Sequence, residues 1–218
     1  MRFFVDTANL QDIKSAFDMG VISGITTNPV LIRKEGAQNK LREHITSIRS
    51  ICDGEILCQV ISTNAEGMVR QAKEINSWCE NMTIKIPLTQ EGIKAVSILR
   101  RENNEIRTCN TITFSPGQAL MAAMAGATYI SPFYNRTNKD TNSGLYMVEN
   151  IVKVFRANNV KTQIIAASID GPMDVVNMAL LGAEVITAPL KVWQSVLENS
   201  MTQSVLKKFL DGWNGDEF

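Results

Sequence analysis

Histidine is almost missing from this sequence, because His44 is the only one among 218 residues. A catalytic triad built on histidine, or a metal site with several histidine ligands, needs more imidazole groups than this. We therefore expect acid–base chemistry to depend on carboxylates, lysine, hydroxyl groups or water. We also expect no metal centre of the multi-histidine kind.

Cysteine pairs, long apolar runs and an excess of charge are likewise missing. The four cysteines form no C-x-x-C pair, which is typical of free thiols in a reducing cytoplasm. No apolar run approaches the roughly 20 residues of a membrane span, and Asp6 interrupts the first apolar stretch, so we expect neither a membrane anchor nor a signal peptide. The 22 basic and 22 acidic residues balance, so no net field favours nucleic acid. A small-molecule substrate suits this balance.

Short apolar runs rich in β-forming residues alternate along the chain with longer segments of helical period. We predict eight strands, at residues 3–7, 22–28, 55–62, 82–89, 106–114, 128–136, 163–169 and 184–190. Their mostly continuous apolar character is typical of parallel strands buried on both faces. Gly20, Gly126 and Gly182 each precede a predicted strand, where a left-handed cap would end the helix before it.

Eight strands and eight helices in this length predict a single (β/α)8 TIM barrel, with residues 1–218 as one domain. A doubly wound open sheet is the alternative, and we disfavour it because no G-x-G-x-x-G motif follows the first strand. An additional C-terminal helix is predicted after the last strand, with Leu206, Phe209, Leu210 and Trp213 at helical spacing. This apolar stripe has to cover the barrel mouth or dock on a neighbouring subunit, so we expect a homo-oligomer.

Lys85 is the strongest anomaly in the sequence, because it lies in the centre of the apolar run MTIKIPL. A lysine in a strand buried on both faces is costly unless it is paired or used. The plain alternative is a lysine at the strand edge whose side chain reaches solvent. A barrel favours the functional interpretation, because polar residues near the C-terminal ends of its strands converge on one pocket.

Polar residues do follow or end the other predicted strands. They are Asp6, then Thr26, Thr27 and Asn28, then Gln59, Thr111, Ser131, Arg136 and Ser168. Taken singly, Asp6 or Asn28 is also a preferred helix-capping residue. Taken together, these residues predict a polar pocket that contains one amine.

The amine of Lys85 would act as a nucleophile in such a pocket. Condensed with a ketone, it becomes an iminium that accepts the electrons released when the adjacent carbon–carbon bond breaks. Asp6 is the carboxylate best placed by strand order to move protons at the substrate hydroxyls. A water held by Gln59 and Thr111 is a candidate intermediary.

Ordered motifs along nearly the whole chain resemble the transaldolase family, in the short-chain branch that also contains fructose-6-phosphate aldolase. They are VDTAN (5–9), GITTNPVLI (24–32), CQVIS (58–62), NAEGM (64–68), IKIPLTQEG (84–92), TFSPGQAL (113–120), AGATYISPFYNR (125–136) and AASI (166–169). The resemblance implies Lys85 as the Schiff-base lysine, Asp6 as the acid–base residue, and a water bound by Gln59 and Thr111. It implies that Thr26, Asn28, Ser131, Arg136 and Ser168 hold the sugar or its phosphate. It further implies no cofactor or metal, and assembly into pentamers or decamers with exchanged C-terminal helices.

The chain departs from the family pattern at positions that bear on the reaction. Phe133 matches transaldolases, whereas the aldolase branch has a tyrosine there. Gln59 points toward the aldolase branch, and Cys109 replaces the asparagine expected of a transaldolase. We expect transfer of a dihydroxyacetone unit, with direct fructose-6-phosphate-type cleavage as the alternative. A catalytically idle sugar-binding barrel is a further alternative, which the retained Lys85 and Asp6 disfavour.

Asp170 stands where both branches usually carry an arginine or a lysine that neutralises substrate phosphate. A carboxylate at this position repels a phosphate dianion. We expect either that Lys191 compensates, or that Asp170 pairs with Arg136 and leaves a site for a differently charged donor, such as a sulfonated sugar.

Overall fold

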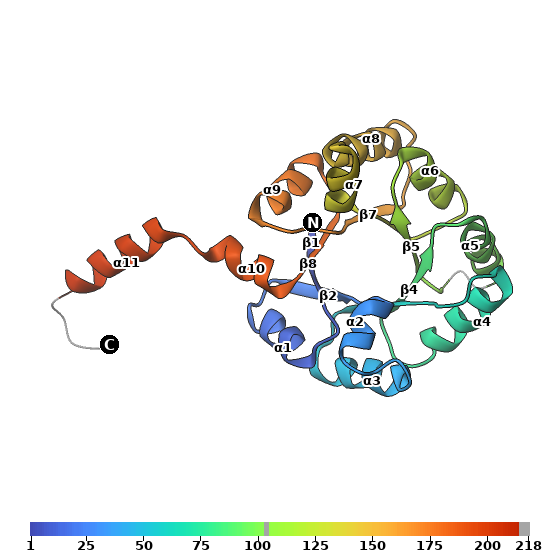
Figure 1. Cartoon of the computed structure of the whole chain (residues 1–218), viewed down its shortest axis with the longest axis horizontal. Helices are drawn as coiled ribbons and strands as arrows, with labels where there is room; N and C mark the ends of the chain where they lie inside the picture. Colours follow the sequence, from blue (N-terminus) through green and yellow to red (C-terminus); the bar gives the residue numbers. More distant parts are fainter. Residues whose placement is uncertain (103–104, 214–218) are drawn as a thin grey trace.

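Eight parallel strands close into a barrel in the computed structural model, which describes residues 1–102 and 105–213 (Figure 1). The strands are β1 (Arg2–Asp6), β2 (Ile22–Thr26), β3 (Glu55–Gln59), β4 (Met82–Pro87), β5 (Thr108–Thr113), β6 (Tyr129–Pro132), β7 (Gln163–Ala166) and β8 (Val185–Ala188). Each pairs with its neighbours in sequence, and β1 pairs with β8. The predicted TIM-barrel fold is confirmed, whereas the tail residues 214–218 lie outside the described part of the chain.

Helices surround this barrel as an outer layer, except for the last one, α11, which extends away from it (Figure 1). They are α1 (Leu10–Asp18), α2 (Pro29–Lys34), α3 (Leu41–Ile51), α4 (Ala65–Asn76), α5 (Gln90–Glu102), α6 (Pro116–Met124), α7 (Tyr134–Thr141), α8 (Gly144–Ala157), α9 (Pro172–Leu181), α10 (Leu190–Leu197) and α11 (Ser200–Asp211). None of these described helices has the length and apolar character needed to cross a membrane.

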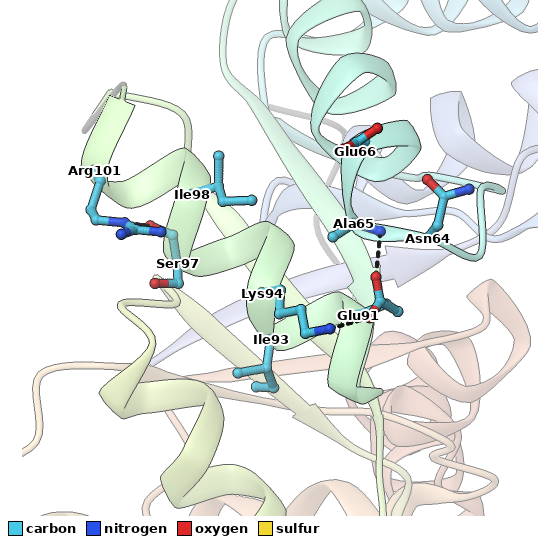
Figure 2. Close-up of a pocket in the computed structure, with 9 residues that line it drawn as sticks. All are labelled: Asn64, Ala65, Glu66, Glu91, Ile93, Lys94, Ser97, Ile98 and Arg101. Carbon is cyan, nitrogen blue, oxygen red and sulfur yellow. Dashed lines mark hydrogen bonds and ion pairs between the residues drawn. The ribbon is translucent and has the colours of Figure 1, made fainter.

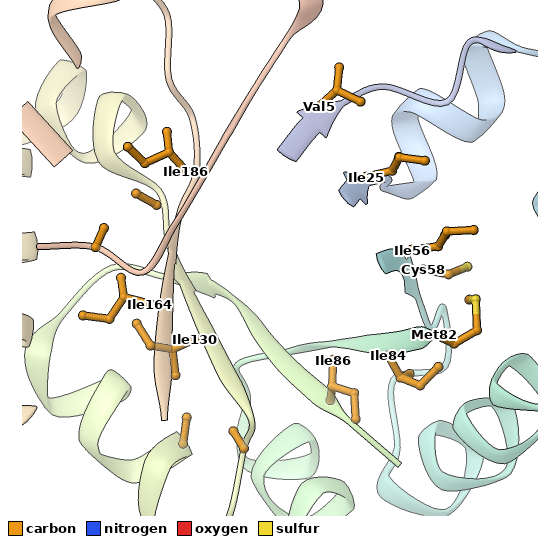
Figure 3. Packing of buried hydrophobic residues seen from close by; sticks show 14 of the residues in the cluster. Val5, Ile25, Ile56, Cys58, Met82, Ile84, Ile86, Ile130, Ile164 and Ile186 are labelled. Carbon is orange, nitrogen blue, oxygen red and sulfur yellow. The ribbon is translucent and has the colours of Figure 1, made fainter. Parts of the chain in front are cut away.

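The strands divide their side chains between two apolar regions, because successive residues of a strand point to opposite faces. Val5, Ile25, Ile84 and Ile186 point outward and pack with helix residues in the main core (Figure 3). Alternate positions form a smaller cluster inside the barrel, made of Phe4, Leu57, Cys109, Tyr129, Ile165 and Val185. Since Ile84 and Ile86 both belong to the outer core, the residue between them faces the barrel interior.

Glycine caps end three helices as predicted. Gly20, Gly126 and Gly182 have φ values of 74°, 95° and 87°. These values lie in the left-handed region, which glycine enters without steric cost. Each cap turns the chain from the end of a helix toward the next strand, which keeps the connections at this end of the barrel short.

The N-terminal end of the barrel is closed by a polar network around Glu55, which is 3% exposed. Arg2 donates to Glu55 at 2.9 Å and to the Tyr129 hydroxyl at 2.8 Å, and Thr83 donates to Glu55 at 2.6 Å. Burial raises the pKa of Tyr129, so its hydroxyl keeps the proton that it donates to Glu55. Because the network fills this end, a substrate has to enter at the other one.

The two last helices differ in how they relate to the barrel. In α10, Trp193 is buried, packs on Phe3 and donates its indole N–H to the Phe4 carbonyl at 2.9 Å. The next helix, α11, extends away from the barrel and has no buried residue (Figure 1). Of the two predicted uses of its apolar stripe, covering the barrel mouth is therefore wrong.

Candidate active site

A polar cavity of about 450 Å³ opens at the C-terminal ends of the strands. Its lining residues are Asp6, Thr26, Asn28, Lys34, Leu57, Lys85, Ser131, Phe133, Arg136, Ala167, Ser168, Ile169, Asp170, Thr187 and Pro189. Nine of them are among the eleven site residues expected from the sequence. Gln59 and Thr111 are not in the lining.

Lys85 projects from β4 into this cavity and is 5% exposed. Its Nζ atom donates to the backbone carbonyl of Thr27 at 2.7 Å. No carboxylate in the described part of the chain lies within ion-pair distance of it. The neighbouring thiol of Cys109 supplies no negative charge either, because burial raises its pKa to about 12.

Asp6, the last residue of β1, lies in a chain of hydroxyl groups. The Thr26 hydroxyl donates to Asp6 Oδ1 at 2.7 Å, and it lies 2.6 Å from the hydroxyl of Thr187. Thr26 and Thr187 are both 2% exposed. The carboxylate is thereby fixed on the wall of the cavity that Lys85 also lines.

Gln59 and Thr111 lie on the strands on either side of β4, Gln59 as the last residue of β3 and Thr111 two residues before the end of β5. Gln59 is the register partner of Lys85, and Thr111 is the partner of Pro87. The Thr111 hydroxyl is buried and has no hydrogen-bond partner among the described residues, which is a rare and costly state unless a ligand or water completes it. The next residue, Ile112, has a φ of 65° and turns outward at a register shift in β5.

This backbone conformation is strained for a β-branched residue, with a cost of about 1–3 kcal/mol. Ile112 is 40% exposed, so the conformation is not driven by burial of its side chain. The shift separates Thr111 from Thr113, which pairs with Pro132 of β6. Strain thus accumulates beside Thr111, whose buried hydroxyl lacks a partner among the described residues.

The outer part of the cavity carries several charges. Asp170 accepts from Lys139 of α7 at 2.6 Å, so the expected pairing with Arg136 is wrong. Lys191 does not compensate, because it lies exposed on α10 outside the lining. Arg136 and Lys34 both line the cavity, and neither forms an ion pair with any described residue.

Ser168 supports this charged end through its backbone and side chain. Its φ of 61° places it in the left-handed region, and its hydroxyl accepts from the Arg136 N–H at 3.2 Å. Its carbonyl accepts from Asn135 at 3.1 Å. The loop after β7 is therefore tied to the start of α7, which carries both Arg136 and Lys139.

Asn28, an expected site residue, and its neighbour Thr27 also have structural roles. Asn28 caps α2, accepting from the backbone N–H groups of Val30 and Leu31 at 3.0 Å each, while it lines the cavity. The hydroxyl of Thr27 points away and donates to the Leu57 carbonyl at 2.8 Å. The contribution of Thr27 to the site is its carbonyl oxygen, which the sequence pattern could not indicate.

Lys34 and Thr187 were missed by the analysis of the sequence. Lys34 is the last residue of the short helix α2, which follows β2. In the sequence, polar residues were considered only at the ends of strands, so Lys34 was not considered. Thr187 precedes Ala188 and Pro189 at the end of β8, in the same position as the other polar strand ends. Polar residues near the end of the eighth strand would have included Thr187 as a candidate, but the sequence would not have shown its contact with Thr26.

A larger hollow, of about 710 Å³, lies on the outside of the barrel between α4 and α5. Figure 2 shows that Glu91 reaches from α5 across to the backbone of Ala65, at 3.0 Å, and also contacts Lys94. These contacts lower the pKa of Glu91, Lys94 being the larger cause. No strand end points into this hollow, so size alone does not identify the site.

Comparisons with known proteins agree with the geometry. A family model described as Transaldolase/Fructose-6-phosphate aldolase matches residues 3–214. A probable transaldolase of Clostridioides difficile is 44% identical over 215 residues, covering 99% of this chain and 98% of the relative. A probable transaldolase of Caldicellulosiruptor saccharolyticus is 45% identical over 214 residues, covering 98% of this chain and 97% of the relative.

Solved structures support the fold alone. Thiamine phosphate pyrophosphorylase from Pyrococcus furiosus superposes with a TM-score of 0.59 at 14% identity, over 85% of this chain and 84% of that one. Inosine 5′-monophosphate dehydrogenase from Legionella pneumophila gives a TM-score of 0.58 at 13% identity, over 98% of this chain and 72% of that one.

The family match extends along nearly the whole length and includes the residues of the cavity. The chain belongs to the transaldolase/fructose-6-phosphate aldolase family.

Proposed function

We propose that this enzyme is a transaldolase in which Lys85 forms a Schiff base with a ketose and transfers a dihydroxyacetone unit to an aldose. The observation that carries the proposal is a lysine that is 5% exposed inside a polar cavity. No carboxylate of the described chain holds its amine in an ion pair. Its hydrogen bond goes to a backbone carbonyl, so the amine remains available to attack a ketone.

The reaction begins when the Lys85 amine adds to the ketose carbonyl and water leaves, forming an iminium. Asp6 accepts the proton of the substrate hydroxyl whose carbon becomes the aldehyde. The carbon–carbon bond then breaks, its electron pair moves to the iminium nitrogen, and the aldose product departs. The enamine that remains attacks the carbonyl carbon of an acceptor aldose, Asp6 returns its proton to the oxygen that becomes the new hydroxyl, and addition of water to the iminium releases the new ketose and the free amine.

Thr111 and Gln59 would hold a water near the amine. The Thr111 hydroxyl is buried and lacks a partner among the described residues, so a water there would complete its hydrogen bonding. Gln59 is adjacent to Lys85 in the sheet register. Such a water would carry protons between the substrate and Asp6 in the proposed reaction.

Transfer rather than direct cleavage is supported by Phe133. This side chain lines the cavity and packs edge-on against Phe114, with ring centroids 5.8 Å apart. A phenyl ring has no proton to give to the bound enamine, so the enamine persists until an acceptor aldehyde arrives. Direct aldol cleavage is the alternative function, and Gln59 is the residue that favours it.

The anionic group of the substrate would lie at the outer end of the cavity. Arg136 and Lys34 are cations without an ion-pair partner in the described chain, and Ser168 adds a hydroxyl. The negative charge of Asp170 weakens the attraction of these cations for an anion, although Lys139 partly offsets that charge. We therefore propose a ketose with one anionic end group, a phosphate or a sulfonate, and weak discrimination in favour of fructose 6-phosphate.

Assembly into a homo-oligomer is part of the proposal. The helix α11 presents Phe209, Leu210 and Met201 to solvent at 72%, 65% and 75% exposure. A described helix with exposed apolar side chains and no buried residue is suited to docking on a second copy of the chain. A cytoplasmic location, a pentamer or decamer, and the absence of a cofactor remain expectations from the family.

Borohydride trapping tests the chemistry. Incubation with fructose 6-phosphate and borohydride should reduce the iminium and leave a covalent adduct on Lys85, located by peptide mass spectrometry. Lys85→Ala and Lys85→Arg should fold normally and show no adduct and no turnover, because the other lysine in the described lining, Lys34, is exposed at the mouth and not buried as Lys85 is. An adduct on Lys94 or Lys191 would refute the assignment, and no adduct at all would favour the idle sugar-binding barrel.

A further inference from the structure

Thr187 is a buried hydroxyl in the cavity wall that the proposed reaction does not use. It lies in β8, is 2% exposed, and its Oγ1 atom is 2.6 Å from Oγ1 of Thr26. Thr26 in turn is 2.7 Å from Asp6 Oδ1. The three side chains come from β1, β2 and β8, which are neighbours in the closed barrel.

The direction of these hydrogen bonds follows from the number of protons. An ionised carboxylate only accepts, so the single proton of the Thr26 hydroxyl is directed to Asp6. Thr26 has then no proton left for Thr187, and the short contact between the two hydroxyls requires Thr187 as the donor. Thr187 therefore donates to Thr26, and Thr26 donates to Asp6, when Asp6 is the ionised carboxylate that can act as a base.

The chain also accommodates the second state of the carboxyl group. Once Asp6 has accepted a proton from the substrate, its O–H can donate to Thr26, and Thr26 can turn its own proton toward Thr187. Both hydroxyls are rotors and need no movement of the backbone for this reversal. Asp6 thus keeps its hydrogen bond to Thr26 in both protonation states, and its carboxyl group does not have to move.

We propose that Thr187 is a positioning residue that, through Thr26, holds Asp6 in the orientation needed for proton transfer. This inference rests on the proposed function, because it assigns a role relative to Asp6 as the acid–base residue. Thr187 acts on the proton-transfer step and not on the affinity for the ketose. Its removal leaves Thr26 free to rotate, so Asp6 loses a fixed donor without leaving a buried group unsatisfied.

The test compares Thr187→Val, which keeps the shape and removes the hydroxyl, with Thr187→Ser, which keeps the hydroxyl. We expect kcat for transfer to fall about tenfold in Thr187→Val, less than the loss of a general acid–base group itself because Asp6 remains present, with KM within about twofold of wild type. Thr187→Ser should restore most of kcat. Thr162→Val is the matched control, because this buried hydroxyl donates to the Ala127 carbonyl outside the cavity.

A double-mutant cycle separates positioning from packing. Because Thr187 acts only through Thr26, Thr187→Val should have no further effect on kcat in a Thr26→Val background. The inference would be overturned if Thr187→Val kept the wild-type kcat, or if the losses of kcat were additive in the double variant. It would also be overturned if Thr187→Val changed only KM or only the melting temperature. Failure of the proposed function is distinguished by the wild-type enzyme, which would then give neither turnover nor a borohydride adduct on Lys85.

Discussion

Lys139 of α7 donates to Asp170 in the loop after β7, with Nζ and Oδ2 2.6 Å apart. Both side chains are largely exposed, at 72% and 53%, so the pair contributes little to stability. Its importance lies in the field at the cavity mouth, where the unpaired Asp170 carboxylate would repel an anionic substrate.

Asp170→Arg is therefore expected to strengthen binding of phosphorylated ketoses. We expect KM for fructose 6-phosphate to fall about tenfold, which corresponds to roughly 1.4 kcal/mol. Lys139→Ala should have the opposite effect, because it leaves the carboxylate unpaired. Lys153→Ala removes a comparable surface pair, with Glu149 on α8, and should change nothing. A wild-type enzyme that strongly prefers fructose 6-phosphate and loses activity on Asp170→Arg would contradict this interpretation.

Lys34→Met should weaken binding of the anionic end group alone. Lys34 lines the cavity and forms no ion pair in the described chain, so its charge is available to the substrate. We expect KM for fructose 6-phosphate to rise about fivefold, as for one exposed charge contact of about 1 kcal/mol, while KM for unphosphorylated fructose stays constant.

The control for Lys34 is Lys14→Met, because Lys14 is exposed on α1, outside the cavity lining. Raising the ionic strength should reduce the difference between wild type and Lys34→Met, since salt screens exposed charges. Equal losses on phosphorylated and unphosphorylated ketoses would show that Lys34 acts on the structure of the mouth and not on the anion.

The fold was predictable because its signals are local. Continuous apolar runs indicate strands buried on both faces, and Gly126 and Gly182 mark helix ends that require a positive φ. The ends of strands were less predictable. The run 128–136 was predicted as one strand, but β6 ends at Pro132 and α7 begins at Tyr134, whose N–H donates to the Ala167 carbonyl.

The site was predictable where a polar residue interrupts an apolar strand. Lys85 and Asp6 stand out in this way, and both line the cavity. Charge pairs across the mouth were not predictable, because the partner of Asp170 is set by the packing of α7 on the barrel. A threonine such as Thr187 is also an ordinary strand residue, so the sequence does not distinguish a hydroxyl that bonds to Thr26 from one that only fills space.

The exposed stripe of α11 leads to a prediction about assembly. No residue of α11 is buried, so Leu206→Glu with Phe209→Glu should leave the thermal stability of the barrel nearly unchanged. We expect the double variant to lose its oligomeric state, as measured by light scattering after size exclusion. Gln203→Glu adds a charge to the same exposed helix and should keep the wild-type mass. A monomeric wild-type enzyme would contradict the proposed assembly.

Phe133→Tyr should shift the enzyme from transfer toward direct cleavage. Phe133 lines the cavity that contains Lys85, and a phenol at this position would bring a hydroxyl that can orient a water and donate a proton to the enamine carbon. Protonation of that carbon converts the bound enamine into an iminium of dihydroxyacetone, which water then releases from Lys85. We expect the ratio of cleavage to transfer to rise about tenfold or more, within the range of one general-acid contact.

The ratio is measured with fructose 6-phosphate, as glyceraldehyde 3-phosphate formed without and with erythrose 4-phosphate as acceptor. Phe114→Tyr is the matched control, because Phe114 packs edge-on against Phe133 but is absent from the cavity lining. A hydroxyl added there changes the same aromatic pair without reaching the enamine. If both tyrosine variants, or neither of them, alter the ratio, then the phenyl ring of Phe133 is not what preserves the enamine for transfer.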